Sequence, residues 1–167
     1  CQGTYFGPEE NLEKSVSSVV IDSRKVQKDS LFIAIRGARV DGHTFITKTI
    51  ESGALCALSE ENLGDVDFSY ILVDSCEQAM KAIAEHYRRS LDIKVVGISG
   101  SVGKTSTKEM IASVLSQKFN VLKTEGNFNN EIGLPLTIFN IREEHEVAVL
   151  EMGISHFGEM TRLAKMA

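Results

Sequence analysis

The chain has little of several residue types that mark particular classes of protein. Its 167 residues include no tryptophan, two prolines and three cysteines, and no apolar run approaches the length of a membrane helix. Such a helix needs about 20 consecutive apolar residues, and a secretory signal needs a basic start followed by an apolar segment. Neither pattern is present, so we expect a cytoplasmic protein without membrane insertion.

The cysteines and histidines do not form a recognisable framework. Cys1, Cys56 and Cys76 are odd in number and show no Cys-x-x-Cys spacing, and the four histidines lack the close spacing of a metal pair. This pattern argues against both a disulfide scaffold and a zinc site. We expect reduced and mostly buried thiols.

Basic charge is also scarce. The formal net charge is -5 and no basic cluster stands out, whereas a nucleic-acid surface needs a clustered excess of lysine and arginine. We therefore expect no nucleic-acid partner. With 43% hydrophobic and 25% charged residues, the composition is that of an ordinary globular protein that can build one good core or two small ones.

The most informative stretch is an apolar run at 95–98 that breaks into glycines and then into a Lys-Thr pair. Gly100 and Gly103 let the backbone curl so that N–H groups can point at phosphate oxygens. Lys104 would add a charge for the β and γ phosphates, and the Thr105 hydroxyl can bind Mg²⁺. The stretch is therefore interpreted as a phosphate-binding loop, against the alternative of a glycine turn with a chance lysine.

The loop fits the short pattern G-x-x-G-K-T better than the full one, because Ile98 stands where the full pattern has glycine. A helix is expected to follow it. Met110, Ile111, Val114 and Leu115 have helical spacing, which predicts that this face packs on a sheet.

Strand and helix patterns alternate along the first ninety residues, which predicts an α/β fold. We interpret residues 1–15 as turn and loop. The expected strands are 17–21, 31–35, 54–58 and 70–73, and the expected helices are 44–52 and one that starts near Ser75. We place a domain boundary between residues 92 and 93, so that a second α/β unit begins with the strand before the glycine loop. That strand is expected to be a central one.

Two polar segments of the first unit have open interpretations. Asp22 and Arg24 follow a strand, where they form either a local ion pair or part of a site. Residues 36–43 contain two arginines, Asp41, Gly42 and His43. Arginine forks suit an anionic ligand, but a solvated connection is the simpler alternative.

The segment 124–135 is dense in asparagine and glycine. Amides donate and accept, so three asparagines within four positions favour binding over an ordinary polar turn. Further on, we expect a buried parallel strand at 147–150, which ends in Glu151. Proteins with a phosphate-binding loop often have a second Mg²⁺ ligand at this position. An exposed glutamate at a strand end is the alternative. His156, in the next loop, either contacts substrate or marks the entry to a last helix.

These motifs, taken in order, closely resemble the Mur ligases of peptidoglycan synthesis. The resemblance rests on Gly100-Ser101-Val102-Gly103-Lys104-Thr105, on Asn127-Phe128-Asn129-Asn130-Glu131-Ile132-Gly133-Leu134-Pro135, on Glu151-Met152-Gly153, and on His156-Phe157-Gly158-Glu159. The amino-terminal motifs Asp22-Ser23-Arg24 and Asp41-Gly42-His43 agree with the UDP-sugar-binding domain of that family.

The resemblance implies an ATP-dependent ligase with Mg²⁺ that joins D-alanyl-D-alanine to UDP-N-acetylmuramoyl-tripeptide through an acyl phosphate. Residues 1–92 would form the UDP-sugar domain and residues 93–167 the start of a P-loop domain, in a monomer. Because Cys1 replaces an initiator methionine and Ala167 lies inside an expected helix, we expect a fragment that is inactive alone.

The resemblance also implies site residues. Lys104, Glu151 and His156 would be catalytic, with Thr105 and Glu151 holding the metal. Nucleotide contacts would come from Gly100, Ser101, Val102, Gly103, Lys104, Thr105, Ser106, Asn127 and Asn130. The UDP-sugar would lie near Ser23, Arg24, Asp41, Gly42 and His43.

Two alternatives remain open at this point. One is a sibling ligase that adds another amino acid, or a folylpolyglutamate synthase. The other is a nucleotide-binding module without chemistry.

Overall fold

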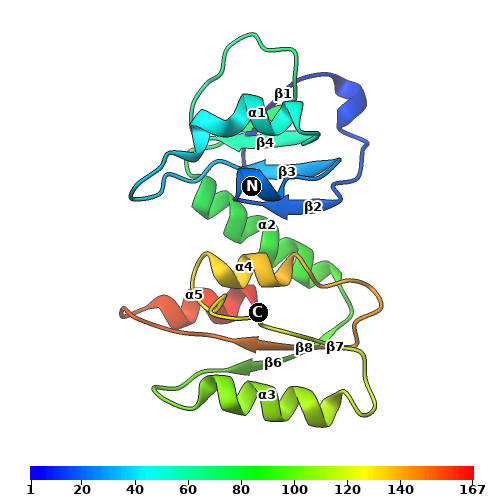
Figure 1. Ribbon diagram of the computed structural model, residues 1–167, viewed down its shortest axis with the longest axis vertical. Helices are drawn as coiled ribbons and strands as arrows, with labels where there is room; N and C mark the ends of the chain where they lie inside the picture. Colours follow the sequence, from blue (N-terminus) through cyan, green and yellow to red (C-terminus); the bar gives the residue numbers. More distant parts are fainter. The chain divides into compact units, whose positions relative to one another are not determined.

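The computed structural model describes residues 1–167, which form two compact units, Cys1–Met80 and Lys81–Ala167. Each unit has its own sheet (Figure 1). The helix α2 (Cys76–Ser90) contains the division between them. The α/β fold expected from the sequence is confirmed, and the domain boundary at 92/93 stays a prediction.

The first unit contains a five-stranded sheet in the order β1-β5-β4-β3-β2. Its strands are β1 (Thr4–Phe6), β2 (Ser18–Val20), β3 (Ser30–Ile33), β4 (Cys56–Ser59) and β5 (Tyr70–Leu72). The strands β2 to β5 are parallel, as expected for alternating strands and connections, while β1 pairs antiparallel with β5.

The interpretation of residues 1–15 as turn and loop was wrong in part. They contain β1 and a short 3-10 helix, η1 (Glu9–Asn11). Phe6 stacks on Tyr70 with ring centroids 4.8 Å apart, so this three-residue strand is stabilised by a partner 64 positions away. A pattern that short carries no periodicity of its own, which is why the sequence did not indicate it.

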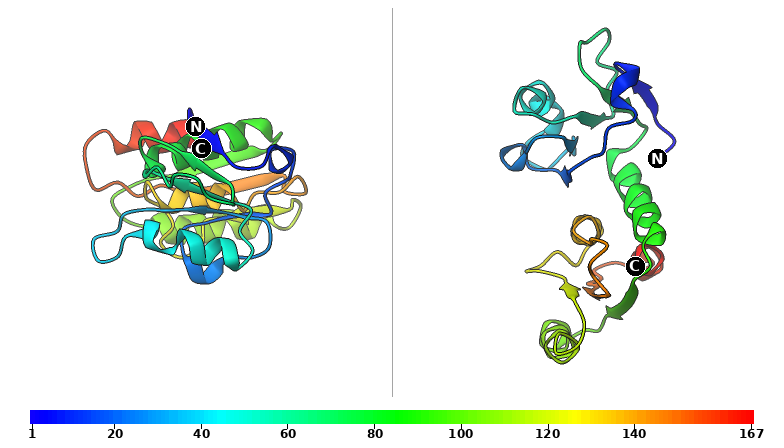
Figure 2. Two further views of the ribbon diagram at one scale, coloured as in Figure 1. Left: turned by 90° about the horizontal axis from the view of Figure 1, so that it is seen from above. Right: turned by 90° about the vertical axis from the view of Figure 1, so that its right-hand side faces the viewer.

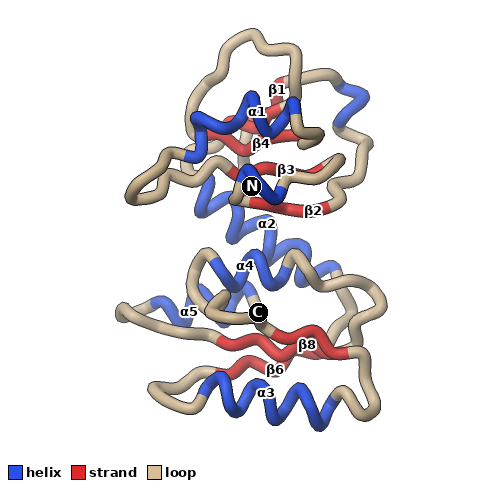
Figure 3. The backbone as a smooth tube through the Cα atoms, in the orientation of Figure 1, coloured by secondary structure: helices blue, strands red, loops and turns tan.

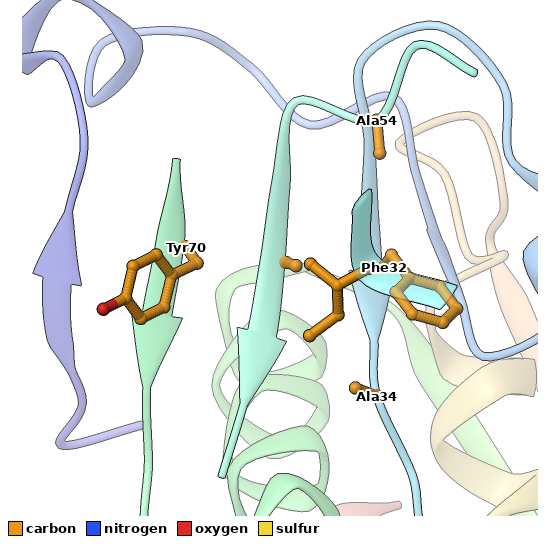
Figure 4. Packing of buried hydrophobic residues seen from close by; sticks show 6 residues of the cluster. Phe32, Ala34, Ala54 and Tyr70 are labelled. Atoms are coloured by element: carbon orange, nitrogen blue, oxygen red, sulfur yellow. The ribbon is translucent and has the colours of Figure 1, made fainter. Parts of the chain in front are cut away.

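One hydrophobic cluster of the first unit lies between its sheet and the helix α1 (Ile46–Glu51). Phe32, Ala34, Ala54 and Tyr70 belong to this cluster (Figure 4), and Ile46 covers it from the helix. The 3-10 helices η2 (Ser23–Lys25) and η3 (Gly42–Phe45) begin in the loops that follow β2 and β3. Loops at these strand ends therefore carry the polar residues singled out above.

The second unit has a three-stranded parallel sheet in the order β6-β8-β7. Its elements are β6 (Lys94–Ile98), α3 (Lys104–Leu115), β7 (Val121–Lys123), α4 (Gly133–Ile138), β8 (Val147–Glu151) and α5 (Glu159–Met166). The helix α3 covers one face of this sheet, and α4 and α5 lie on the other (Figures 2 and 3). All five residues of β8 are buried, because this strand is paired on both sides.

Among the three strands of this unit, β8 pairs with both β6 and β7, so β6 lies at one edge of them. The expectation of a central strand stays a prediction. The expected sheet-facing side of α3 was wrong in part, because Met110 and Val114 are each 71% exposed, whereas Ile111 and Leu115 pack on the core. The side that packs inward carries Ile111, Ala112 and, unexpectedly, the buried Lys108. No helix in the structure combines the length and apolarity needed to cross a bilayer.

Candidate nucleotide site

The loop between β6 and α3 has the backbone that a phosphate-binding loop requires. Gly100 has φ +152° and Gly103, at the start of α3, has φ +79°, both in the region that favours glycine. No atom lies within 4 Å of where a Cβ on Gly103 would be, so no packed side chain fills the space at that glycine. The Lys104 ammonium donates to the Gly100 carbonyl at 2.7 Å and so lies folded over the loop.

The structure brings Thr105 and Glu151 together. The Thr105 hydroxyl donates to the Glu151 carboxylate, with Oγ1 at 3.1 Å from Oε2 and 3.3 Å from Oε1. Thr105 opens the first turn of α3, and Glu151 ends β8, which pairs with β6 so that Ile98 is opposite Glu151. Parallel pairing thus places the strand-end carboxylate beside the glycine loop, as the sequence suggested.

Glu151 is buried rather than exposed at the end of its strand, with 3% of its side chain accessible. The Asn129 amide donates to Oε1 at 2.9 Å, and the Lys108 ammonium lies 3.7 Å from Oε2. Its backbone N–H donates to the Thr124 hydroxyl at 2.9 Å. A buried carboxylate needs such donors and a counter-charge, and here all of them come from the second unit.

Lys108 connects this carboxylate with a second acidic group. Its Nζ lies 3.3 Å from Glu109 Oε1, and the other oxygen of Glu109 is paired with Lys123 at the end of β7. These two lysines lower the pKa of Glu109 from its ordinary value, mainly through the hydrogen bond from Lys123 and then through that from Lys108. Positive and negative side chains therefore alternate in the order Lys123, Glu109, Lys108 and Glu151.

The donor set suits Mg²⁺. Thr105 and Glu151 offer only oxygen ligands, which Mg²⁺ prefers, and octahedral ligands about 2.1 Å from the ion lie about 3 Å from one another. The observed separation of Thr105 Oγ1 from Glu151 Oε2 is 3.1 Å. These two residues could therefore hold the ion together.

The amide-rich segment has mixed roles. Asn130 Oδ1 accepts the backbone N–H groups of Ile132 and Gly133 at 3.1 and 2.8 Å, so its side chain shapes the turn into α4. Asn127 is exposed. Asn129, which lies between them, is the residue that contacts Glu151.

His156 lies in the loop between β8 and α5, and its side chain is exposed. Its backbone N–H and that of Ser155 donate to Glu159 Oε2 at 3.0 and 2.6 Å. Those two bonds lower the pKa of the Glu159 carboxyl, with His156 contributing more. Glu159 therefore holds the loop in shape through backbone N–H groups, and the His156 imidazole takes no part in these bonds.

In the first unit, Asp22 and Arg24 form the local ion pair. Arg24 Nε and its terminal nitrogen donate to the two Asp22 oxygens at 2.9 and 2.8 Å, and the Arg24 backbone N–H adds a third bond. The side-chain bond from Arg24, followed by the backbone bond, lowers the pKa of Asp22 to about 2. Ser23 is the first residue of η2, within this turn.

Asp41 and His43 form a second local pair. His43 Nδ1 lies 2.6 Å from Asp41 Oδ1, and Nε2 accepts the Glu60 backbone N–H at 3.0 Å. Since Nε2 accepts, Nδ1 carries the proton and donates to Asp41. Only 4% of the His43 side chain is exposed, so the imidazole is enclosed.

Asp41, His43 and Glu61 bring potential metal-binding atoms within 4.8 Å of one another. The Arg36 guanidinium already lies there, with Nε 3.4 Å from Asp41 Oδ2 and a terminal nitrogen 2.5 Å from Glu61 Oε1. The cation of this cluster is therefore an arginine. Gly42 packs tightly beside it, because a Cβ there would lie 2.7 Å from the backbone of Ile35.

Two family models match the chain. The model of the Mur ligase family catalytic domain matches residues 15–88, and that of the Mur ligase middle domain matches residues 98–167. Together they cover most of the sequence. The chain belongs to the Mur ligase family.

Named relatives agree with this assignment. The UDP-N-acetylmuramoyl-tripeptide--D-alanyl-D-alanine ligase of Bacillus subtilis is 40% identical over 168 residues, covering 99% of this chain. A crystal structure of MurF from Acinetobacter baumannii matches with a TM-score of 0.88 and 31% identity over 99% of the chain. The MurF ligase of Thermotoga maritima in complex with ADP matches with a TM-score of 0.82 and 37% identity over 90% of the chain.

This Mur ligase chain spans about a third of the length of those relatives, namely 36% of the Bacillus subtilis protein and 36% and 35% of the two structures.

Sequence reasoning missed two residues of this candidate site. Asn129 was within the recognised motif but was not distinguished from its neighbours, because its contact with Glu151 depends on tertiary structure. Lys108 was missed because only apolar residues were compared with helical spacing, and the predicted face joined Met110 and Val114 to Ile111 and Leu115. It lies three and four positions before Ile111 and Ala112, which is the helical spacing that would have placed it on the sheet side.

Proposed function

We propose that the protein is an ATP-dependent amide-bond ligase of peptidoglycan precursor synthesis, which joins D-alanyl-D-alanine to UDP-N-acetylmuramoyl-tripeptide. The Bacillus subtilis relative carries this ligase activity in its name, and it aligns with almost the whole of this chain. It also favours this reaction over that of a sibling ligase or of a binding module.

The observation that carries the proposal is the contact between Thr105 and Glu151 at the mouth of an open glycine loop. A glycine turn with a chance lysine would give no reason to bury a carboxylate against the hydroxyl that follows the lysine. A phosphate-binding loop gives such a reason, because nucleotide phosphates and Mg²⁺ need oxygen ligands and N–H donors together.

In this proposal the glycine loop binds the phosphates, and side chains beside it hold the ion. The backbone N–H groups of residues 100–106 point to the phosphates, and Lys104 leaves the Gly100 carbonyl to neutralise charge on the transferring phosphoryl group. Thr105 and Glu151 would hold the ion, and Asn129 would fix the Glu151 carboxylate. Magnesium, when bound, neutralises charge on the phosphate oxygens.

The reaction consists of two substitutions. The terminal carboxylate of the peptide attacks the γ-phosphorus of ATP, forming an acyl phosphate and releasing ADP. The amine of D-alanyl-D-alanine then attacks the acyl carbon, the amide bond forms, and inorganic phosphate leaves with the electron pair of the broken C–O bond and takes up the proton that the nitrogen releases. Asn127, Asn130 and the exposed His156 would line this reaction centre.

The UDP-sugar would bind to the first unit. Ser23, Arg24, Asp41, Gly42 and His43 lie at or near its site in this proposal. The Asp22–Arg24 and Asp41–His43 pairs already satisfy most of the polar groups involved. Their contribution is therefore to shape the two loops, with backbone groups left to meet the ligand. We further propose that the protein acts in the cytoplasm as a monomer.

Acceptor-dependent phosphate release in the full-length protein tests the proposal. Release should require ATP, Mg²⁺, UDP-N-acetylmuramoyl-tripeptide and D-alanyl-D-alanine together. Release driven by a different amino acid would establish the sibling ligase instead. Nucleotide binding without release for any acceptor would establish the binding module.

A further inference from the structure

Lys108 takes no part in the proposed reaction, although it is the most completely buried cation of the chain. Only 2% of its side chain is exposed, and it lies one helical turn after Lys104 on the side of α3 that faces the sheet. Burying an ammonium is costly unless carboxylates surround it, so its position requires a reason.

The neighbours of Lys108 supply that reason. Its Nζ is 3.7 Å from Glu151 Oε2 and 3.3 Å from Glu109 Oε1. Glu109 is also neutralised by Lys123, so Lys108 is left as the counter-charge of Glu151. Glu151 has no other cation within 4 Å, since its remaining side-chain partners are the neutral Thr105 and Asn129.

We propose that Lys108 is a positioning residue that acts as the built-in counter-cation of Glu151 and reserves the metal site for an ion that arrives with a nucleotide. This inference rests on the proposed function and adds a specific property to it. The group consisting of Lys123, Glu109, Lys108 and Glu151 has no net charge, so a free divalent cation gains little there. The phosphates of a nucleotide supply the missing negative charge.

Removing the charge of Lys108 should therefore create a cation site that works without nucleotide. The group would then have a net charge of -1, with Glu151 as the unpaired carboxylate beside the Thr105 hydroxyl. Unit charges about 4 Å apart interact strongly even at a protein surface, so the affinity for a divalent cation should rise on the order of tenfold or more.

The experiment measures binding of Mn²⁺ to the full-length protein in the absence of nucleotide. Binding is followed by the decrease in the electron paramagnetic resonance signal of the Mn²⁺ that stays free in solution. Wild type should bind Mn²⁺ weakly, and Lys108→Met should bind it at least about tenfold more tightly. Lys108→Arg keeps the charge and should behave as wild type. In the double variant Lys108→Met with Glu151→Gln, the gain should be absent.

Lys123→Met is the matched control. Lys123 shares the Glu109 carboxylate with Lys108 but does not contact Glu151, and it is 41% exposed. Its variant should leave Mn²⁺ affinity within about twofold of wild type, because solvent screens an exposed charge. If Lys108→Met does not fold, as judged by circular dichroism, Lys108→Gln replaces it, since glutamine keeps a donor without the charge.

The inference is overturned if the uncharged variant gains no Mn²⁺ affinity, if the gain persists without the Glu151 charge, or if Lys123→Met gains as much. Failure of the proposed function is a separate result. In that case wild type shows no Mg²⁺-dependent binding of ADP, whatever the variants do with Mn²⁺ alone.

Discussion

Thr105 and Glu151 are 46 residues apart in the sequence, yet the Thr105 hydroxyl lies 3.1 Å from the Glu151 carboxylate. Two short elements produce this contact. The parallel pairing of β6 with β8 sets Ile98 opposite Glu151, and the glycine turn brings α3 back over the strand ends. A residue in the first turn of a helix and a residue at the end of a strand thus bring two oxygen-bearing side chains together.

The Thr105 hydroxyl should be needed for metal-dependent nucleotide binding. Thr105→Val keeps the shape of the side chain but removes the oxygen, so we expect the Mg²⁺-dependent part of ADP affinity to fall about tenfold or more, and affinity in EDTA to change little. Titration calorimetry with and without Mg²⁺ measures both. Thr105→Ser, which retains the oxygen, should stay close to wild type. Equal losses with and without Mg²⁺ would contradict the metal role.

Much of the local structure around this contact could be predicted from the sequence. The glycine spacing indicated the loop, the apolar run at 147–150 indicated the buried strand, and the strand-end position indicated Glu151. These features are short-range patterns, because a tight backbone turn requires glycine and a buried strand requires consecutive apolar residues. Both requirements can be recognised from residues that are neighbours in the sequence.

What could not be predicted depends on partners distant in sequence. The strand β1 is recognisable only through its pairing with β5, and the inward side of α3 is set by the sheet beneath it. Lys108 is a polar residue on that inward side, so a pattern of apolar residues did not include it. Asn129 and Asn130 are adjacent asparagines, and only tertiary structure shows that one contacts Glu151 and the other shapes the turn into α4.

Asn129 should position Glu151. Its side-chain amide donates to Glu151 Oε1 at 2.9 Å, and its backbone carbonyl accepts the Gly153 N–H at 2.7 Å. Asn129→Ala removes the first bond and leaves a buried carboxylate oxygen with one donor fewer, which we expect to reduce kcat at least about tenfold. Steady-state assays of ligase activity measure this. Asn140→Ala is the control, because the Asn140 side chain bonds only to the Leu136 carbonyl of α4. Equal values of kcat for Asn129→Ala and Asn140→Ala would show that Asn129 does not position Glu151.

Gly42 should matter first for packing. A methyl group there would lie 2.7 Å from both backbone N and O of Ile35, whose carbonyl accepts the Gly42 N–H at 2.9 Å. We expect Gly42→Ala to lower the free energy of unfolding by about 1–3 kcal/mol, because backbone must move. Urea unfolding measures this, with Arg39→Ala in the same exposed loop as the control. Full stability combined with lost UDP-sugar binding would instead assign the glycine to the ligand.

Glu131 should make stability depend on pH below neutrality. Its hydrogen bond from Arg162, together with that from Lys81 on α2, lowers the pKa of its carboxyl from 4.5. A carboxyl whose pKa is lower in the folded state stabilises the fold above its unfolded pKa, and this contribution is lost as pH falls through the folded value. Glu131→Gln should therefore cost about 1 kcal/mol at neutral pH and less below about pH 4.

Urea unfolding of Glu131→Gln and wild type at several pH values tests this difference. Glu143→Gln, an exposed glutamate without an ion pair, is the control and should not change with pH relative to wild type. A cost for Glu131→Gln that stays constant from neutral to acidic pH would show that the carboxylate charge is not what stabilises the fold.

The two buried thiols should resist alkylation in the folded protein. Burial raises the pKa of Cys56 and of Cys76 to about 12, and the nearby Glu60 carboxylate adds to the effect at Cys76. At about pH 8 only about one thiol in ten thousand would then be ionised, and the thiolate is the reactive form. Iodoacetamide followed by peptide mass mapping should label the exposed Cys1 and leave the other two unmodified.

Protection of Cys76 should depend on Glu60, since Glu60 Oε1 accepts the Cys76 N–H at 2.8 Å at the start of α2. Glu60→Ala removes that acceptor, so the first turn of α2 should open more often and Cys76 should be labelled faster. Cys56 lies within β4 and has no such link, so its protection should not change. Equal acceleration at both thiols would mean that Glu60 stabilises the whole unit rather than the start of α2, and that the first turn does not open independently.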